Sequence, residues 1–389
     1  MSDRTATAAG PKILIDASSV TAVPDGLSTY IIQLIRYLPA AAPDIAFTTL
    51  LNPGVTRPDL AEALAHGGMP VLTQRVAAIG PRRDWQMLNL LRQWRGRFDL
   101  IHITSMTYPL ALAGGVCTVH DLTYRKWFHG GPLWRAAART YLDLVIRTCV
   151  RRASAIIAVS DQTRLDVADL AGQRAEDLPK LTVIHEGWEH MAARPVGDPV
   201  PDGVPRRDYL FFLGTNRAHK NLTNLLLAFE RALPDLPPTK SLVITGSSAK
   251  LDAAQRSIVD RINTAGQRIV FTGFVSDMAV AELFERADAF VFPSLKEGFG
   301  LPILEAFHHR TPLLAAEAPA IPEVAGDAAL FFDPHSVASI AAALVRFYRE
   351  PELGPMLAER GTQRLAQFSW VKAAAETVAV YRKALGAQV

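Results

Sequence analysis

The sequence has few cysteines and no long apolar run, and each absence excludes a class of protein. Only Cys117 and Cys149 occur among 389 residues, without the spacing of metal ligands. A disulfide framework is therefore not expected, and a reducing compartment fits best. No apolar run approaches the ~20 residues of a membrane-spanning helix. The first ten residues are small and polar and contain no apolar signal-peptide region. We expect a cytoplasmic protein, at most peripheral on the inner face of the cytoplasmic membrane.

Two further motifs are missing. The loop that follows the first expected strand, Asp25-Gly26-Leu27-Ser28, lacks the Gly-x-Gly-x-x-Gly fingerprint of an NAD-dependent dehydrogenase. No Asp-x-Asp pair stands at the end of an expected strand, so we expect neither a metal nor any other cofactor.

The composition is that of a globular protein with more than one domain. Hydrophobic residues make up 49% and charged residues 20% of the chain, which argues against disorder. Apolar strand-like runs alternate with helix-like segments throughout, which is the α/β pattern. Residues 192–208 hold four prolines and two glycines and are typical of a linker. We expect twin doubly wound domains at 1–195 and 206–368, with ligands bound beyond the carboxyl ends of the strands, and a last helix within 369–389.

Most of these elements are expected from short buried runs. The expected strands include 12–20, 71–77, 115–120, 181–186, 209–214 and 289–293, and the expected helices include 27–38, 135–152, 221–233, 302–308 and 370–385.

Positive charge is concentrated in one region. Residues 81–152 carry 12 lysines and arginines against four aspartates, a local charge of +8 in a chain of net +3. Five large aromatics are interleaved with these charges: Trp85, Trp94, Trp127, Phe128 and Trp134. This mixture fits contact with anionic lipid headgroups. A solvated basic face beside core aromatics explains it equally well, and we find no nucleic-acid recognition motif.

The most informative motif is Glu297-Gly-Phe-Gly-Leu-Pro-Ile-Leu-Glu305, which joins the expected strand at 289–293 to the expected helix at 302–308. Gly298 and Gly300 allow close approach of the backbone to a ligand. The N–H groups of Phe299, Gly300 and Leu301 lie at the helix start, where they suit an anionic or hydroxylated ligand. Taken alone, a Gly-x-Gly segment would be interpreted as an ordinary turn.

A second motif follows the first strand of the second half, in the segment Leu213 to Leu222. Gly214 permits a tight turn, and Arg217 and Lys220 place positive charge near the next helix start. A diphosphate needs this combination of cations and helix amides.

Two sites in the first half are less specific. His120 precedes Asp121 at the end of an expected strand, where a lone histidine is more often structural. Gly26 lies where phosphates often bind, although Asp25 serves equally well as a simple helix cap.

Together these segments resemble retaining glycosyltransferases of family 4, which have the GT-B fold. The Glu-x7-Glu motif, the phosphate loop, His120-Asp121 and Thr272-Gly273-Phe274-Val275 carry the resemblance, which is dense from Leu213 to Pro334. The family usually has an arginine directly after the loop glycine, whereas this chain has Thr215 followed by Asn216. The resemblance implies two Rossmann-like domains facing a central cleft, with the C-terminal helix crossing back to the N-terminal domain.

The resemblance also implies roles for the matching positions. Glu305 would hold the ribose hydroxyls, Glu297 would hold hydroxyls of the transferred sugar, and His120 would orient that sugar. Lys220, helped by Arg217, would stabilise the departing diphosphate. The remaining donor-binding positions are Gly26, Gly214, Thr215, Asn216, Gly273, Phe274, Val275, Gly298, Phe299, Gly300 and Leu301.

The implied function is retaining, metal-independent transfer of a hexose from a nucleoside diphosphate sugar. Similarity to bacterial mannosyl- and rhamnosyltransferases favours GDP-mannose as donor and a polyprenyl-diphosphate-linked or oligosaccharide acceptor of surface polysaccharide or lipopolysaccharide synthesis. UDP- and dTDP-sugars remain open as donors. So do three different activities: a GT-B epimerase, a GT-B phosphorylase and a non-catalytic sugar-nucleotide binder.

Overall fold

The computed structural model describes residues 10–127, 131–192, 200–201, 203–264 and 266–386. The chain forms two compact units: the first comprises residues up to Glu186 together with those from Trp370 onward, and the second runs from Gly187 to Ser369. The expected end of the first domain at residue 195, residues 193–199 and 202 of the expected linker, and Phe128 lie outside the described residues.

The first unit is built on a seven-stranded parallel sheet with the order β3-β2-β1-β4-β5-β6-β7. Its strands are β1 (Lys12–Asp16), β2 (Ala46–Leu51), β3 (Val71–Thr73), β4 (Leu100–Ile103), β5 (Val116–Val119), β6 (Ala155–Ala158) and β7 (Leu181–Val183). Its helices are α1 (Gly26–Ala41), α2 (Pro58–Gly67), α3 (Pro81–Gln93), α4 (Tyr124–Trp127), α5 (Pro132–Arg152), α6 (Asp161–Ala171) and α15 (Trp370–Gly386). Strands β5 and β6 are buried along their whole length, as expected of a parallel sheet covered on both faces.

The second unit has a six-stranded parallel sheet with the order β10-β9-β8-β11-β12-β13. Its strands are β8 (Tyr209–Phe212), β9 (Ser241–Ile244), β10 (Ile269–Phe271), β11 (Ala289–Phe292), β12 (Leu313–Ala316) and β13 (Ala329–Phe332). Its helices are α7 (Glu189–Ala192), α8 (Leu222–Ala232), α9 (Ala253–Asn263), α10 (Asp277–Arg286), α11 (Leu301–His308), α12 (Ile321–Ala325), α13 (Val337–Arg349) and α14 (Leu353–Leu365). Both sheets match the predicted doubly wound α/β class.

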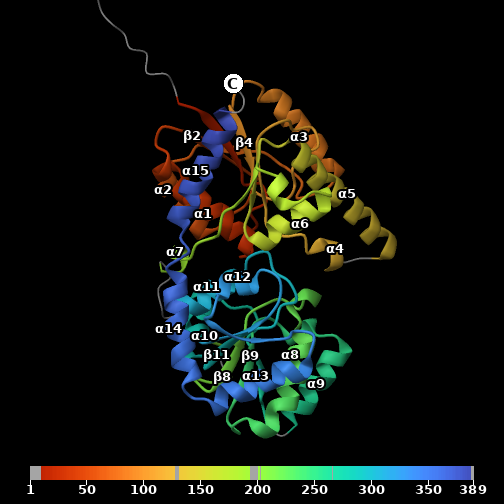
Figure 1. Ribbon diagram of the computed structural model, residues 1–389, viewed down its shortest axis with the longest axis vertical. Coiled ribbons are helices and arrows are strands. Elements are labelled where there is room, and N and C mark those ends of the chain that lie inside the picture. Colours follow the sequence, from red (N-terminus) through yellow and green to blue (C-terminus); the bar gives the residue numbers. More distant parts are fainter. Residues whose placement is uncertain (1–9, 128–130, 193–199, 202, 265, 387–389) are drawn as a thin grey trace, which may run out of the picture. The chain divides into compact units, whose positions relative to one another are not determined.

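The C-terminal helix α15 belongs to the first unit, where it packs against α1 (Figure 1). A buried polar chain fixes it there. The hydroxyl of Tyr381 lies 2.6 Å from Nδ1 of His102 on β4. Nε2 of His102 lies 2.8 Å from the hydroxyl of Thr118 on β5, which in turn lies 2.9 Å from the hydroxyl of Tyr30 on α1. The expected return of the last helix to the N-terminal domain is therefore confirmed.

Several strands are shorter than the sequence suggested. The first strand ends at Asp16 and not at Val20, and the third ends at Thr73 and not at Ala77. Beyond the last residue of each strand, backbone N–H groups bond to side chains and not to a neighbouring strand. Asp16 accepts from the N–H of Ser18, and Asn52 accepts from the N–H of Val76. In both segments the apolar sequence continues beyond the last residue that pairs with a neighbouring strand.

Candidate functional site

Most of the predicted donor-binding residues lie on two loops at the switch point of the second sheet. Strands β8 and β11 are neighbours, but the chain proceeds from β8 to one edge of the sheet and from β11 to the other. At such a switch point the loops after the two strands diverge, which leaves room for a ligand beyond their carboxyl ends. The loop after β8 contains Gly214 to Lys220, and the loop after β11 contains Glu297 to Gly300.

Lys220 and Glu297 meet directly. The Nζ atom of Lys220 lies 2.7 Å from Oε1 of Glu297, and both side chains are mostly buried. The ammonium group also lies 5.7 Å from the ring centroid of Phe292, within the range of a cation–π contact. A cation and a carboxylate are thereby held side by side at the switch point.

Asn221 holds these loops together, although it was not among the residues predicted for the site. Its backbone has φ +61°, and its buried Nδ2 donates to the carbonyls of Pro293 (3.1 Å) and Pro334 (2.8 Å). These carbonyls follow β11 and β13. The signal in the sequence was an asparagine directly before a helix, a residue that tolerates the left-handed region.

The rest of the loop after β8 divides into anchored and exposed positions. The N–H of Gly214 donates to Oγ1 of Thr245, which anchors the turn after the strand. The side chain of Asn216 is used internally: it exchanges two hydrogen bonds with Gln255 on α9 and donates to the carbonyl of Lys250. Asn216 therefore positions the loop through its side chain.

Thr215 and Arg217 are exposed in the same loop. Within the described part of the chain, no hydrogen bond or ion pair to the guanidinium of Arg217 is found. The guanidinium of Arg217 is therefore exposed to solvent at the position where a second cation was expected.

The Gly298–Leu301 segment leads into α11. Gly300 is the N-cap with φ +106°, and a Cβ at this position would lie 3.1 Å from Cδ1 of Ile303, so a side chain there would be both strained and crowded. Phe299 is buried edge-on to Phe368 and fixes the turn. Glu305 is half-buried in the second turn of α11. The structure therefore places Glu297 and Glu305 on one loop–helix unit.

The Gly273–Val275 segment follows β10. Gly273 has φ +71° and exchanges two backbone hydrogen bonds with Gly246 after β9. Phe274 is 83% exposed, which is unusual for so large an apolar side chain. Its ring is available for stacking on a planar ligand.

His120 and Gly26 belong to the first unit, whereas all the other predicted site residues belong to the second. Nε2 of His120 lies 3.0 Å from the carbonyl of Thr104, and the ring meets Tyr30 edge-on at 4.7 Å. Gly26 is the first residue of α1, and Asp25 caps this helix by accepting from the N–H of Ser28. The helix-cap interpretation of Asp25 is confirmed.

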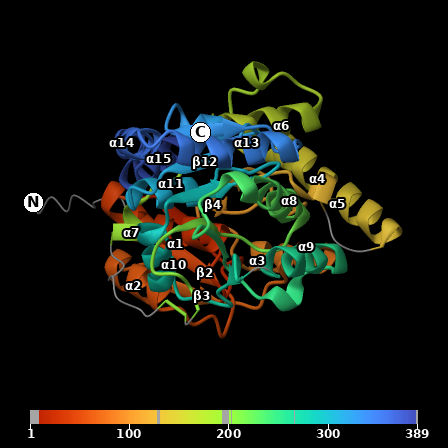
Figure 2. The same cartoon turned by 90° about the horizontal axis from the view of Figure 1, so that it is seen from below.

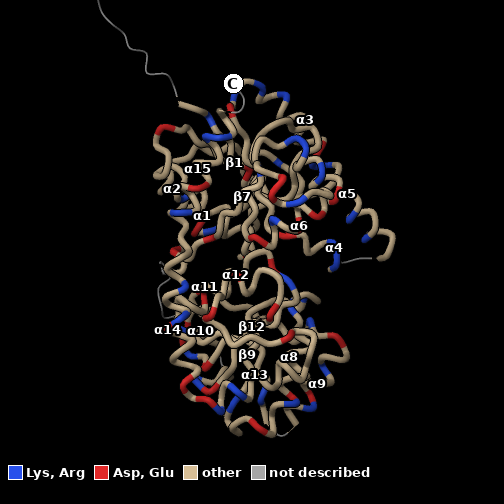
Figure 3. The backbone as a smooth tube through the Cα atoms, in the orientation of Figure 1, with Lys and Arg blue, Asp and Glu red and all other residues tan. Residues whose placement is uncertain are grey.

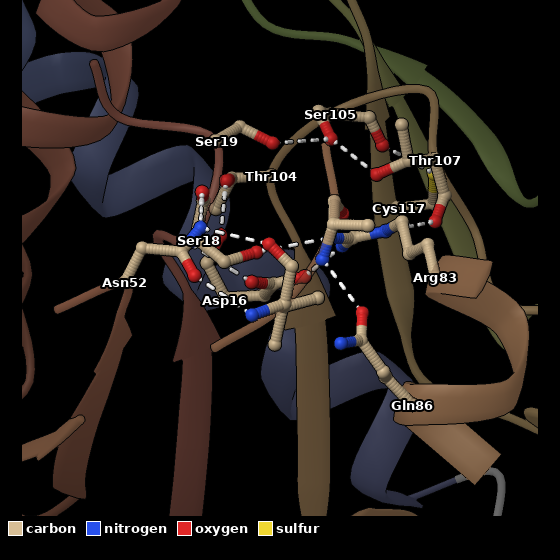
Figure 4. Close-up of polar contacts among 12 residues, drawn as sticks. Asp16, Ser18, Ser19, Asn52, Arg83, Gln86, Thr104, Ser105, Thr107 and Cys117 are labelled. Carbon is tan, nitrogen blue, oxygen red and sulfur yellow. Dashed lines mark hydrogen bonds and ion pairs between the residues drawn. The ribbon is translucent and has the colours of Figure 1, made fainter. Parts of the chain in front are cut away.

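A buried ion pair lies at the switch point of the first sheet, between β1 and β4, where no site residue was predicted (Figure 4). Nη2 of Arg83 lies 2.5 Å from Oδ2 of Asp16, and the two side chains are 1% and 2% exposed. Arg83 also donates to Oγ of Ser18 and to the carbonyls of Ala77 and Thr107. With so many partners, the buried charge is compensated.

A row of hydroxyl groups lies beside this pair. Ser19 Oγ lies 3.2 Å from Ser105 Oγ, which lies 2.7 Å from Thr107 Oγ1 (Figure 4). Ser105 is buried, whereas Ser19 and Thr107 are half-buried, so the two outer hydroxyls of the row reach the carboxyl edge of the first sheet.

The basic region 81–152 is only partly a surface. Arg83 and Trp94 are buried, whereas Trp85 and Trp134 are largely exposed. The amino-terminal half of α5 projects from the first unit in both views (Figures 1 and 2), with Leu133 88% exposed. Arginines lie along α5 (Figure 3), at positions 135, 139, 147, 151 and 152. The region therefore combines a core aromatic, Trp94, with an exposed face that carries both aromatic side chains and positive charge.

Neither a membrane-spanning helix nor a metal cluster occurs in the described residues. No helix among them is both long and apolar enough to cross a bilayer. No group of three or more His, Cys, Asp or Glu side chains in these same ranges is arranged to hold a metal ion.

Comparison with known proteins agrees with this geometry. Residues 24–190 match the family described as Glycosyltransferase Family 4, and residues 202–364 match the family described as Glycosyl transferases group 1. The O-antigen chain mannosyltransferase B of Escherichia coli is 25% identical over 92% of this chain and 96% of its own length. The MMP alpha-(1->4)-mannosyltransferase of Mycolicibacterium hassiacum is 29% identical over 75% of this chain and 72% of its own length.

Solved structures share the fold. HepE of Anabaena, in complex with UDP and glucose, superposes with a TM-score of 0.70 over 96% of this chain and 99% of its own, at 19% identity. Each unit has a parallel sheet, and the candidate site lies at the switch point of the second sheet. The two family matches together span most of the sequence. The chain therefore belongs to the family 4 glycosyltransferases of the GT-B fold.

Proposed function

We propose that this glycosyltransferase moves a hexose from a nucleoside diphosphate sugar with retention at the anomeric carbon, and that the donor is GDP-mannose. The acceptor is a lipid-linked or oligosaccharide glycan of bacterial polysaccharide or glycolipid synthesis. The mannosyltransferase names of the relatives support this donor sugar. The observation that carries the proposal is the Lys220–Glu297 pair at the switch point of the second sheet.

The donor would be divided between the two loops. Lys220 and the exposed Arg217 would bind the diphosphate, while Glu297 and the amides at the start of α11 would bind hydroxyls of the hexose. Glu305 would bind the ribose, with Phe274 beside the base. As the bond to the leaving diphosphate breaks, negative charge grows on it, and a fixed cation there is typically worth ~3–4 kcal/mol.

Retention would follow from a front-face transfer. The proposal gives no carboxylate the role of a covalent nucleophile, so the acceptor hydroxyl would attack from the face that the diphosphate leaves. The departing phosphate oxygen would accept the proton of that hydroxyl. Lys220 would stabilise the negative charge that develops as this bond breaks, and we propose that no metal ion is required.

A specific observation favours a second donor class as well. The solved HepE structure contains UDP and glucose, so a UDP-sugar is the main competing donor, with dTDP-sugars next. A panel of GDP-, UDP- and dTDP-sugars, tested for thermal stabilisation with EDTA present, distinguishes them. A ligand at 100 times its Kd adds ~2.7 kcal/mol. Stabilisation by GDP-mannose supports the proposal, and a response only to UDP-sugars moves the donor to that class.

The Glu297→Ala variant separates a transferase from a sugar-nucleotide binder. We expect it to lose sugar transfer while still binding the free nucleotide, because Lys220 and Glu305 remain. The matched control is Glu317→Ala, which removes an exposed carboxylate just after the neighbouring strand β12.

Turnover of a sugar nucleotide without any acceptor would point to an epimerase, and phosphate-dependent cleavage would point to a phosphorylase. The anomeric configuration of the product, determined by NMR, tests retention.

We also propose that the first unit selects the acceptor and contacts the cytoplasmic membrane. The half-buried hydroxyls of Ser19 and Thr107 would face acceptor hydroxyls, and the projecting end of α5 would contact anionic lipid. Leu133 and Trp134 provide exposed apolar area, and two arginines, Arg135 and Arg139, follow them on the helix.

Vesicle binding tests the membrane contact. Co-sedimentation with anionic vesicles at low salt, lost in Leu133→Ser/Trp134→Ser, is the expected result. No sedimentation of the unaltered protein would remove this part of the proposal.

A further inference from the structure

Glu186 is a buried carboxylate that the proposed function does not use. It follows β7, is the last residue of the first unit before the chain enters the second, and is only 4% exposed. A carboxylate removed from water is costly unless it is paired or protonated. Among the described residues, the partner found for it is His120, whose Nδ1 lies 3.5 Å from Oε1 of Glu186.

The other side of the His120 ring determines where its protons lie. Nε2 is 3.0 Å from the carbonyl oxygen of Thr104. A carbonyl oxygen only accepts hydrogen bonds, so Nε2 must carry a hydrogen. In a neutral ring Nδ1 would then direct a lone pair at the Glu186 carboxylate. The contact is favourable only if a second proton lies between Nδ1 and Oε1.

The rings that face this pair are uncharged. Tyr30 on α1 meets the His120 ring edge-on, and its pKa is raised by burial and, to a smaller degree, by the negative charge of Glu186. His102 on β4 has a pKa lowered to about 3, mainly by burial and also by the positive charge of His120. The neighbouring carboxylate of Asp121 accepts from the N–H of Thr123. These contacts leave Glu186 as the counter-charge of His120.

We propose that Glu186 is a positioning residue that keeps Nδ1 of His120 protonated and fixes the plane of its ring. Nε2–H then bonds to the carbonyl of Thr104, and the Nδ1 edge of the ring faces the Glu186 carboxylate 3.5 Å away. The ring of His120 would act on a substrate through its positive charge and not as a hydrogen-bond acceptor. The carbonyl of His120 accepts from the hydroxyl of Thr163 at 2.9 Å, which holds the backbone in place.

The proton location can be measured without any ligand. In the full chain labelled with 15N-histidine, the ring signals of His120 are identified by their absence in His120→Asn. We expect both ring nitrogens of His120 to carry a hydrogen in the unaltered protein. In Glu186→Gln, which keeps size and burial, Nδ1 should lose its proton while Nε2 keeps it.

The exposed Glu176→Gln is the matched control and should change nothing. A neutral His120 ring in the unaltered protein, or an identical ring in Glu186→Gln, would overturn the proposal.

The catalytic consequence rests on the proposed function. With GDP-mannose as the probe, Glu186→Gln should lower kcat by roughly tenfold or more while leaving KM within about twofold, because a lost charge is felt most where charge develops in the transition state. Restoration of activity by Glu186→Asp would support a charge role. If kcat falls and KM rises by the same factor, the role of Glu186 is merely structural, which would contradict the proposal. If no sugar nucleotide turns over at all, the proposed function fails while the nitrogen spectra still test Glu186.

Discussion

Lys220 and Glu297 neutralise each other across a separation of 77 residues in the sequence, at a distance of 2.7 Å. The cation expected to bind the diphosphate and the carboxylate expected to bind the sugar are thus each other's partner before any ligand arrives. A donor must compete for both ends of this pair. The dianionic diphosphate is the stronger competitor for the ammonium group, so donor binding should loosen the pair and leave Glu297 an acceptor for sugar hydroxyls.

Replacement of Lys220 by methionine should abolish most turnover. The variant keeps the length of the side chain but removes the charge that would stabilise the leaving group, so kcat should fall by ~10²–10³. Lys250→Met, which replaces an exposed lysine in the same unit, is the control and should retain activity. Initial rates of sugar transfer or donor hydrolysis measure both. Full activity in Lys220→Met would remove Lys220 from the proposed mechanism.

Loss of the buried Arg83 should remove much of the stability margin of the first unit. Arg83→Met leaves the Asp16 carboxylate buried without its counter-charge, which costs about 3–5 kcal/mol. Arg82→Met, one residue earlier and exposed, should stay within about 0.5 kcal/mol. Urea denaturation followed by circular dichroism gives both values. Equal midpoints for the two variants would show that the ion pair contributes little.

His102 should make the protein acid-sensitive. Burial lowers its pKa to about 3, whereas the unfolded chain has the ordinary value of ~6.5. The unfolded state therefore binds a proton first, so this contribution to stability is present above about pH 6.5 and is lost as the pH falls toward 3. Between these two pH values the free energy of unfolding should fall by at most ~1.4 kcal/mol per pH unit through this group.

The measurement is the urea midpoint at several pH values for the unaltered protein and for His102→Asn. The variant should be less stable at neutral pH, because it disturbs the contacts to Tyr381 and Thr118, but it should lose less stability on acidification. His66→Asn, at an exposed position, is the control. Parallel acid profiles for all three proteins would contradict the prediction.

Two glycines of α14 should respond oppositely to alanine. A Cβ at Gly361 would lie 2.5 Å from Cδ1 of the buried Phe307 on α11, so Gly361→Ala should destabilise by about 1–3 kcal/mol. At Gly354 the nearest atoms are 3.8 Å away, so Gly354→Ala should be neutral or stabilise by up to ~1 kcal/mol. Thermal melts of the two variants test the pair, and a destabilisation of equal size in both would refute the packing argument.

The fold was largely predictable because local patterns carry it. Buried apolar runs such as Tyr209–Phe212 and Ala289–Phe292 indicated the strands, and the alternation with helices indicated the α/β class. Strand ends were overestimated where side chains such as Asp16 replaced backbone pairing. Residues of the candidate donor site were found through a motif, since Gly300 and Glu305 lie at fixed offsets from Glu297.

The sequence does not show contacts between residues that only the order of the strands brings together. Asp16 and Arg83 are 67 residues apart, and His102 and Tyr381 are 279 apart, yet each pair is buried in contact. No local spacing marks such partners. Arg83 was counted as part of a basic surface because charge is normally exposed, and Glu186 lay in a segment without any charged pattern.

Helix α15 gives the chain a particular order of completion during synthesis. Residues 187–369 are continuous in sequence, so the second unit can reach its final contacts while the chain is still growing. The first unit cannot, because the buried Trp370 and Tyr381 that complete its core are made last. The nascent first unit therefore has an uncovered face of α1, and a His102 that lacks its Tyr381 partner, for about the time needed to make the whole second unit, ~10–40 s at ~5–20 residues per second. During that interval it is exposed to chaperones and to proteolysis.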